Sequence, residues 1–295
     1  MKIKKLLVEN LWDKHTFTID FNKDVTILIG KNGSGKSTVL NLIDDVLSNG
    51  KNNKNYRFKK IELLSLDNEI VSNKIGFEHL FLSTFDMEVK NRESIKKNYD
   101  DKSTVQTELD VILNNLVTDF KFYLLKTKEL VERVQKEFDK ELEIYTSTNN
   151  IEGLKEKLLE KKKQISKIYE NRDLFKNKIN ELFRDTDKRI TLDENNSIVF
   201  QLNDKSYLTP YQLSSGEKQI LIIMLNIMLL ENKSTILLMD EPEISLHVEW
   251  QRVFIEMLLE LNPNLQIVIA THSPAIVSKK FRSKVVSLSN FHVKG

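Results

Sequence analysis

The sequence contains no cysteine among its 295 residues. Disulfide bonds and thiolate metal sites are therefore excluded, and nothing marks the chain for an oxidising compartment. A secretory signal is also missing, because residues 1–15 alternate between apolar and basic positions and then turn polar. These absences lead us to expect a cytoplasmic protein.

Long apolar runs and a strong charge imbalance are missing as well. The most apolar segment, residues 220–230, spans about 11 residues, whereas a membrane helix needs about 20. We therefore expect a buried helix there and no membrane partner. The formal net charge is only +2, so any nucleic-acid contact must come from local clusters of basic residues. Contact with nucleic acid stays open on this evidence.

Strand patterns alternate with helical patterns in the two outer parts of the chain, which predicts an α/β fold. A continuous β-branched strand at residues 25–29 leads into a helix that ends at Asn49 and Gly50. The remaining predicted strands are residues 3–8, 16–21, 61–66, 75–83, 189–192, 198–202, 206–208, 235–239, 265–270 and 285–288, and the remaining predicted outer helices are 217–230 and 248–261.

The middle of the chain reads as two long amphipathic helices. Apolar residues recur every three or four positions over residues 105–145 and again over 151–183, with a polar break between them. We expect an antiparallel helical hairpin about 50 to 60 Å long. The apolar stripe exceeds what two paired helices need at Phe120, Phe122, Tyr123, Leu124 and Leu125. It predicts docking on another subunit or on the effector, with packing against the chain's own head domain as the alternative.

A glycine-rich turn follows the strand at residues 25–29. Residues 30–37 read Gly-Lys-Asn-Gly-Ser-Gly-Lys-Ser and lie between a strand and a helix, which is the context that a phosphate-binding loop requires. Backbone N–H groups and the helix N-terminus favour phosphate, Lys36 reaches its oxygens, and Ser37 is a ligand for Mg²⁺. We expect ATP with Mg²⁺ to bind here, through Asn32, Gly33, Ser34, Gly35, Lys36, Ser37 and Thr38.

Two acids end the hydrophobic strand at residues 235–239. Asp240 and Glu241 should lie at the carboxyl edge of the sheet, beside the phosphate-binding loop. We expect Asp240 to hold Mg²⁺, directly or through water, and Glu241 to orient and deprotonate the attacking water. Without the loop, such a pair of acids would more simply be a helix cap.

The segment Leu213–Gln219, which reads Leu-Ser-Ser-Gly-Glu-Lys-Gln, resembles the signature of ABC ATPases. The resemblance implies that Ser214, Ser215, Gly216 and Glu217 contact ATP held by an opposite subunit. It therefore implies a homodimer with ATP sandwiched between two heads, and leaves a higher oligomer open. Alone, the segment would be an ordinary helix N-cap.

Two further motifs follow in the family's order. The segment Ser245-Leu246-His247 resembles the D-loop, and Thr271-His272-Ser273 resembles the switch-histidine segment. The resemblance implies that His272 contacts the γ-phosphate and holds the attacking water. The sequence departs from the family after Ser83, where the glutamine loop is expected but the next residues are Thr84, Phe85 and Asp86.

The arrangement of two lobes around a hairpin resembles the RecF, SMC and OLD-type branch. It implies an N-terminal lobe at residues 1–90, a helical insertion at 91–186 and a C-terminal lobe at 187–295. The chain lacks the cysteines of a zinc hook, and we expect no Toprim nuclease because the sequence stops just after the last predicted strand. It thus resembles the ATPase subunits of bacterial antiphage systems of the PARIS and Septu type, which work with a separately encoded effector. A RecF-like repair ATPase and an ATP-gated scaffold with negligible turnover are the alternatives.

Two weaker sequence features suggest contacts with ligands. Residues 51–60 carry five basic and two aromatic side chains and no acid, which suits phosphate contact but also suits a solvated loop. Trp12 and His15 lie near the position expected for adenine recognition, although a tryptophan near the N-terminus also suits the core.

Overall fold

The computed structural model describes residues 2–48, 56–71, 78–83, 107–147 and 150–288. The chain forms two compact units, the first made of residues 1–90 and 232–295 and the second of residues 91–231. In the described part, no helix is both long and apolar enough to cross a membrane. The division expected from the sequence places the signature segment, residues 213–219, in a C-terminal lobe, whereas here it belongs to the second unit with the hairpin. The expected three-part division stays a prediction.

The described residues of the first unit form two sheets. A parallel sheet has the strand order β11-β3-β10-β9-β5, and an antiparallel sheet has the order β2-β1-β4. The strands are β1 (Ile3–Leu11), β2 (His15–Asp20), β3 (Val25–Ile29), β4 (Lys60–Ser65), β5 (His79–Ser83), β9 (Ile236–Asp240), β10 (Gln266–Ala270) and β11 (Val285–Ser287). Since β10 pairs with both β3 and β9, the segments that follow these three strands emerge side by side.

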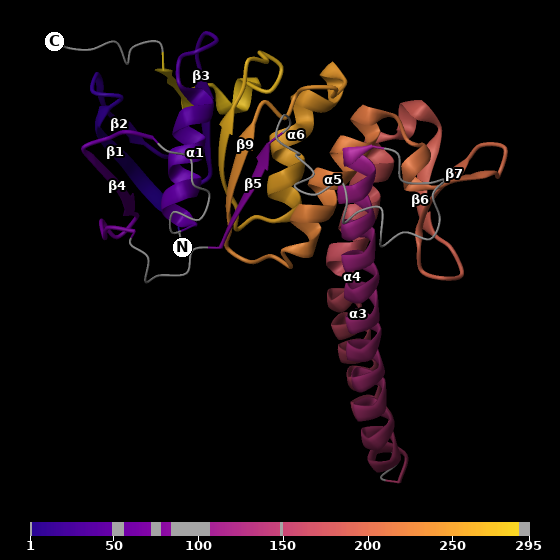
Figure 1. The fold of residues 1–295 in the computed structure, drawn as a ribbon. Helices are drawn as coiled ribbons and strands as arrows, with labels where there is room; N and C mark the ends of the chain where they lie inside the picture. Colours follow the sequence, from indigo (N-terminus) through magenta and orange to yellow (C-terminus); the bar gives the residue numbers. More distant parts are fainter. Residues whose placement is uncertain (1, 49–55, 72–77, 84–106, 148–149, 289–295) are drawn as a thin grey trace, which may run out of the picture. The chain divides into compact units, whose positions relative to one another are not determined.

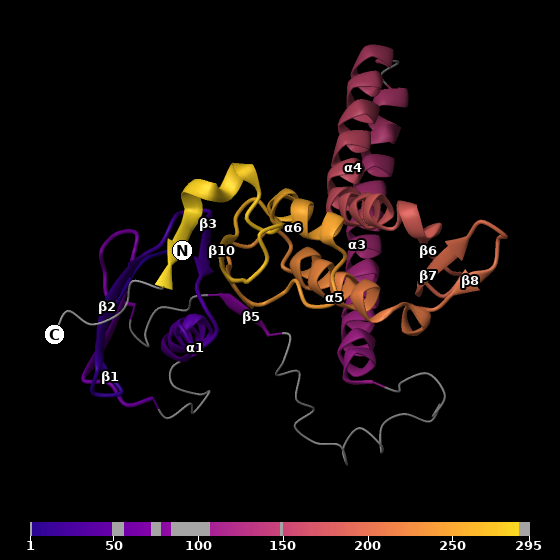
Figure 2. The same ribbon diagram turned by 90° about the horizontal axis from the view of Figure 1, so that it is seen from above.

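Helix α1 (Lys36–Leu47) lies between the two sheets (Figures 1 and 2). Its buried residues Val39, Leu40, Leu42 and Ile43 join one hydrophobic core with residues from β1 and from β3, β9 and β10. Side chains alternate along the parallel strands, so the opposite face of the sheet is also apolar and needs cover. Helix α6 (Val248–Leu261) lies on that side, away from α1 (Figures 1 and 2).

One buried amide joins the two sheets of the first unit. The Gln266 side chain on β10 accepts a hydrogen bond from the Ile3 N–H at 2.7 Å and donates to the Ile3 carbonyl at 2.7 Å. Its Nε2 also donates to the Asn22 carbonyl at 2.7 Å. Because a buried amide is stable only when its polar atoms are paired, this contact fixes the start of β1 against the amino end of β10, the central strand of the parallel sheet.

The second unit is built on an antiparallel pair of helices, α3 (Glu108–Ser147) and α4 (Ile151–Leu182). Helix α5 (Ser215–Leu229) packs against both. A small antiparallel sheet follows α4, with strands β6 (Lys188–Leu192), β7 (Ile198–Leu202) and β8 (Tyr207–Leu208). Short 3₁₀ turns cover residues Arg184–Thr186 and Pro210–Gln212.

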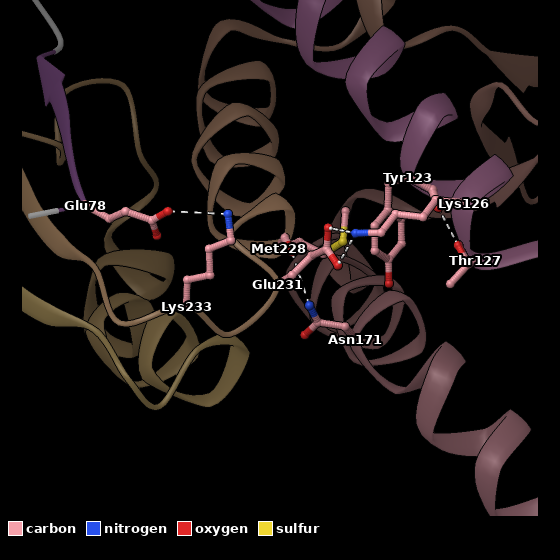
Figure 3. Close-up of polar contacts among 8 residues, drawn as sticks. All are labelled: Glu78, Tyr123, Lys126, Thr127, Asn171, Met228, Glu231 and Lys233. Atoms are coloured by element: carbon pink, nitrogen blue, oxygen red, sulfur yellow. Dashed lines mark hydrogen bonds and ion pairs between the residues drawn. The ribbon is translucent and has the colours of Figure 1, made fainter. Parts of the chain in front are cut away.

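Polar contacts tie α5 to the hairpin at both of its ends. At the first turn, the buried Lys218 ammonium lies 2.7 Å from the Asp110 carboxylate of α3. At the other end, Lys126 of α3 pairs with Glu231 at 2.8 Å, and the Asn171 side chain of α4 donates to the Met228 carbonyl at 3.1 Å (Figure 3). The hairpin and α5 therefore form one packed body. Figure 3 also shows a contact of the first unit, the 3.4 Å ion pair between Lys233 and Glu78.

The apolar stripe on α3 divides into two parts. Phe120 and Tyr123 are buried inside the second unit, where Phe120 packs against Phe175 of α4 with ring centroids 5.9 Å apart. Phe120 is therefore covered by the other helix of the hairpin, which differs from both expected arrangements. Phe122 and Leu125 lie on another face of the helix and are 64% and 54% exposed.

The α/β class and the helical hairpin expected from the sequence are confirmed. The predicted strand at residues 75–83 is observed as His79–Ser83, Glu78 lies before its start, and residues 75–77 lie outside the described part. The other predicted helices and strands differ from the observed ones by at most three residues at either end. Such shifts are ordinary at frayed ends.

Candidate functional site

The loop between β3 and α1 has the geometry of a phosphate-binding loop. Gly33 and Gly35 have φ values of 77° and 93°, a left-handed region that glycine enters without steric cost. Gly35 directly precedes α1, so the free amides at the start of this helix face the loop. At Gly30, any side chain would collide with the Ser34 hydroxyl. The glycines of the motif are thus required by the fold of the loop.

Three predicted residues meet beside this loop. The Lys36 side chain is buried, and its ammonium donates to the Gly30 carbonyl at 3.2 Å and lies 2.6 Å from His272 Nε2. His272 Nε2 in turn lies 3.4 Å from Glu241 Oε1. Because an ammonium can only donate, a hydrogen bond between the two requires Nε2 to accept. A cation, an imidazole and a carboxylate thus converge at one sheet edge.

Asp240 and Ser37 have the oxygen ligands that Mg²⁺ requires. Asp240 ends β9, opposite Ala270 of β10 and Ser83 of β5 in the strand register. Ser37 lies in the first turn of α1 and is exposed, and α1 packs on β9. No cluster of three His, Cys, Asp or Glu able to hold a metal occurs in the described residues. Mg²⁺ does not need one, since it is usually bound by one or two protein oxygens and by substrate phosphates. The donor set therefore fits the ion.

A cavity of about 440 Å³ adjoins the loop. One wall consists of Lys31–Gly35, Thr38 and Val39, and the other of Leu11, Trp12, His15, Phe17 and Leu288. Trp12 is 45% exposed and packs edge-on against His15, with ring centroids 6.3 Å apart. The core alternative for Trp12 is therefore wrong, because the ring lines a cavity. Phe17 and Leu288 are wall residues that the sequence motifs did not indicate.

The turn after β10 is organised by Glu243, a residue to which the sequence motifs gave no role. Its Oε1 accepts hydrogen bonds from the Thr271 hydroxyl at 2.7 Å and from the N–H groups of His272 and Ser273 at 2.7 and 3.1 Å. Glu241 is fixed to the same strand, because its N–H donates to the Ala270 carbonyl at 2.8 Å and its backbone is left-handed, with φ 47°.

The signature residues belong to the second unit and form the N-terminus of α5. The Ser214 hydroxyl and N–H both donate to Glu217 Oε2 at 3.0 Å, and the Glu217 N–H returns a bond to the hydroxyl. This arrangement is a capping box. Ser215 and Gly216 make the first turn, where free amides favour an anion. The N-cap reading of the segment is therefore correct for the isolated chain.

Glu217 also forms an ion pair within this cap. Its Oε1 lies 2.8 Å from the Lys188 ammonium. Burial pushes the pKa of Glu217 upward, but the bonds from Lys188 and from Ser214 outweigh burial, so the pKa lies below its usual value. A charged Glu217 thus holds the cap in place.

Two expectations fall partly or wholly outside the described residues. Residues 84–86, where the glutamine loop of ABC ATPases is expected, lie outside them. Of the basic strip at residues 51–60, only residues 56–60 are described, and Phe58 among them is 37% exposed.

Comparison with known proteins places this site in context. The chain is 23% identical to the Retron Vc95 probable ATPase of Vibrio cholerae serotype O1 biovar El Tor, over 87% of this chain and 67% of that protein. It is also 23% identical to the Septu protein PtuA of Bacillus thuringiensis, over 97% of this chain and 75% of that protein. Among solved structures, the Smc head domain of Pyrococcus furiosus with an extended coiled coil matches 97% of this chain and 93% of that chain, with a TM-score of 0.49 and 15% identity.

A family model matches residues 25–278, which span the phosphate-binding loop, the hairpin, Asp240, Glu241 and His272. The match includes both units and most of the chain. The fold is accordingly that of an α/β P-loop ATPase head of the ABC type with an inserted helical hairpin, and the site binds nucleotide. The chain belongs to the family described as "AAA domain, putative AbiEii toxin, Type IV TA system".

Proposed function

We propose that the protein hydrolyses ATP at the site formed by the phosphate-binding loop, Asp240, Glu241 and His272. The observation that carries the proposal is the convergence of Lys36, His272 and Glu241 beside the phosphate-binding loop, whose residues 31–35 line a cavity. Lys36 binds the phosphates, and the loop amides and the N-terminus of α1 neutralise their charge. Ser37 and Asp240 hold Mg²⁺, which when bound offsets charge on the phosphate oxygens.

In this proposal Glu241 and His272 act on water. Glu241 accepts the proton of the attacking water, and His272 keeps that water in line with the γ-phosphate. The contact between His272 and Lys36 links the two halves of the site, because Lys36 binds the phosphates while His272 contacts Glu241. The cavity beside Trp12 and His15 takes the adenine base, with Trp12 as a stacking surface.

We further propose that two copies close head to head on ATP. The N-terminus of α5 at Ser214, Ser215 and Gly216 then binds the ATP of the opposite copy. The resemblance to the ABC signature supports this arrangement.

The cellular role that we propose is that of an ATPase subunit in an antiphage system, working with a separately encoded effector. The similarity to the retron ATPase and to the Septu protein supports it. The RecF-like alternative gains no such support from these two relatives.

Turnover of purified wild type and Lys36→Ala tests the proposal. Wild type should release phosphate from ATP in the presence of Mg²⁺, and Lys36→Ala should neither bind nor hydrolyse ATP. Lys218→Met, which also removes a cation, is unsuitable as a control because Lys218 is part of a buried ion pair. The exposed Lys280→Ala is suitable, since Lys280 lies outside the cavity wall. Wild type without activity above Lys36→Ala would refute ATP hydrolysis.

A further inference from the structure

We propose that Glu243 is a positioning residue for His272, acting through the backbone of the turn after β10. The inference rests on the proposed function, since it concerns the residue that we assign to the attacking water. Three donors from Thr271, His272 and Ser273 meet at a single oxygen of Glu243, at 2.7, 2.7 and 3.1 Å. One of them is the N–H of His272 itself.

The chemistry of this contact favours a carboxylate. All three groups donate, and a carboxylate only accepts, so every bond is of the charge-assisted kind, which is stronger than a neutral bond. The Thr271 side chain belongs to a fully buried residue, and Glu243 Oε2 is a buried atom with no hydrogen-bond partner among the described residues. A glutamine would weaken the three bonds and leave its NH₂ group at a position without an acceptor.

A second contact fixes the same turn to the same segment. The Ser273 hydroxyl donates to Gln251 Oε1 at 2.6 Å, and Gln251 Nε2 donates to the Leu246 carbonyl at 2.8 Å. The turn is thus attached at two points to the stretch that runs from Glu243 into α6. Gln251 holds the far side of the turn, whereas Glu243 holds the backbone of His272.

The position of the imidazole follows from this attachment. His272 Nε2 lies 2.6 Å from Lys36 Nζ and 3.4 Å from Glu241 Oε1, and both distances depend on where the His272 backbone is held. Glu243 does not touch these reacting groups in the contacts of the described residues, so its effect passes through His272. Misplacing a catalytic group by about 1 Å can cost on the order of 100-fold in rate.

A double-mutant cycle tests the proposal. We measure turnover and ATP affinity for wild type, Glu243→Gln, His272→Ala and the double variant. Glu243→Gln should lower kcat by about 10- to 100-fold with KM and ATP affinity nearly unchanged, and should have no further effect when His272 is alanine. Glu249→Gln is the matched control, because Glu249 is exposed and pairs with Arg252 on the surface of α6. An equal loss in the His272→Ala background would overturn the proposal.

A second measurement is independent of turnover. Amide hydrogen exchange of His272 and Ser273, recorded without nucleotide, should be faster in Glu243→Gln than in wild type or Glu249→Gln. Unchanged exchange would overturn the positioning role, even if the protein hydrolyses no ATP. An inactive wild type, in contrast, would refute only the proposed function. If Glu243→Gln does not fold, Thr271→Val takes its place in both measurements. It removes one of the three donors. Because the Thr271 hydroxyl also accepts from the Ser273 N–H at 2.9 Å, only the exchange of the His272 amide is then compared, together with the double-mutant cycle.

Discussion

The Lys36 ammonium lies 2.6 Å from His272 Nε2, although the two residues are 236 positions apart in the sequence. The contact couples the residue to which we assign phosphate binding to the residue that we assign to the attacking water. A hydrogen bond between them requires Nε2 to accept, since an ammonium can only donate. In the proposed function, binding of phosphate to Lys36 and orientation of the His272 ring are therefore linked.

Glu241→Gln should separate binding from hydrolysis. The amide keeps the size of the side chain but cannot take a proton from water, so turnover should fall by about 10²- to 10⁴-fold. ATP affinity should stay near that of wild type, and ATP-bound dimers should accumulate. Phosphate release and light scattering with ATP measure the two effects. A variant that turns over at the wild-type rate would exclude Glu241 as the base.

Ser214→Arg should leave ATP binding intact and prevent dimerisation. Ser214 belongs to the second unit and caps α5, so the change does not alter the phosphate-binding loop. Light scattering with ATP in the Glu241→Gln background measures dimer formation. Ser214→Ala is the control for the lost cap, which is worth about 1 kcal/mol, because it adds no bulk. Dimers of normal mass in Ser214→Arg would argue against a role of this segment in closure.

Trp12→Ala should weaken ATP binding. The ring lines the cavity beside the loop, and the loss of stacking on a base costs about 1 to 3 kcal/mol, equivalent to about a 5- to 150-fold rise in Kd. Because the phosphates keep their contacts, the affinity for inorganic triphosphate should not change. Titration with both ligands measures this difference. Tyr207→Ala, an exposed aromatic of the second unit, is the control. Equal losses for ATP and triphosphate would refute base stacking.

Glu217 should make stability depend on acid pH. Its pKa is lower in the folded protein than the usual value of 4.5, so its stabilisation is present above that value and is lost as the pH falls through the folded pKa. Glu217→Gln should lower Tm at pH 7, and the gap from wild type should narrow below about pH 4.5. Thermal melts from pH 7 to pH 3.5 measure the gap. The exposed Glu181→Gln should melt like wild type at every pH. A gap that is constant with pH would exclude this role of the charge.

The phosphate-binding loop illustrates what local sequence determines. Strand, glycine turn and helix are contiguous in the chain, and the positive φ angles of Gly33 and Gly35 need only glycine at those two positions. A binding loop that is formed by consecutive residues can be predicted without knowledge of the rest of the fold. The same holds for the capping box at Ser214 and Glu217, which are three residues apart.

The hairpin shows where sequence periodicity reaches its limit. Periodicity identified both long helices, because an amphipathic stripe is a property of one segment. It did not separate Phe120, which is buried against Phe175, from Phe122, which is 64% exposed. That distinction depends on which neighbours cover each face of α3.

By itself, the sequence determined the α/β class and the hairpin, and it indicated the residues to which we assign phosphate and Mg²⁺, because each depends on short-range pattern. Tertiary structure alone decided that β10 lies between β3 and β9, which brings His272 between Lys36 and Glu241. It also decided the role of Glu243, whose carboxylate receives three donors from a turn about 30 residues away. These contacts join strands that are adjacent in space but not in sequence, so only the pairing of the parallel sheet fixes them.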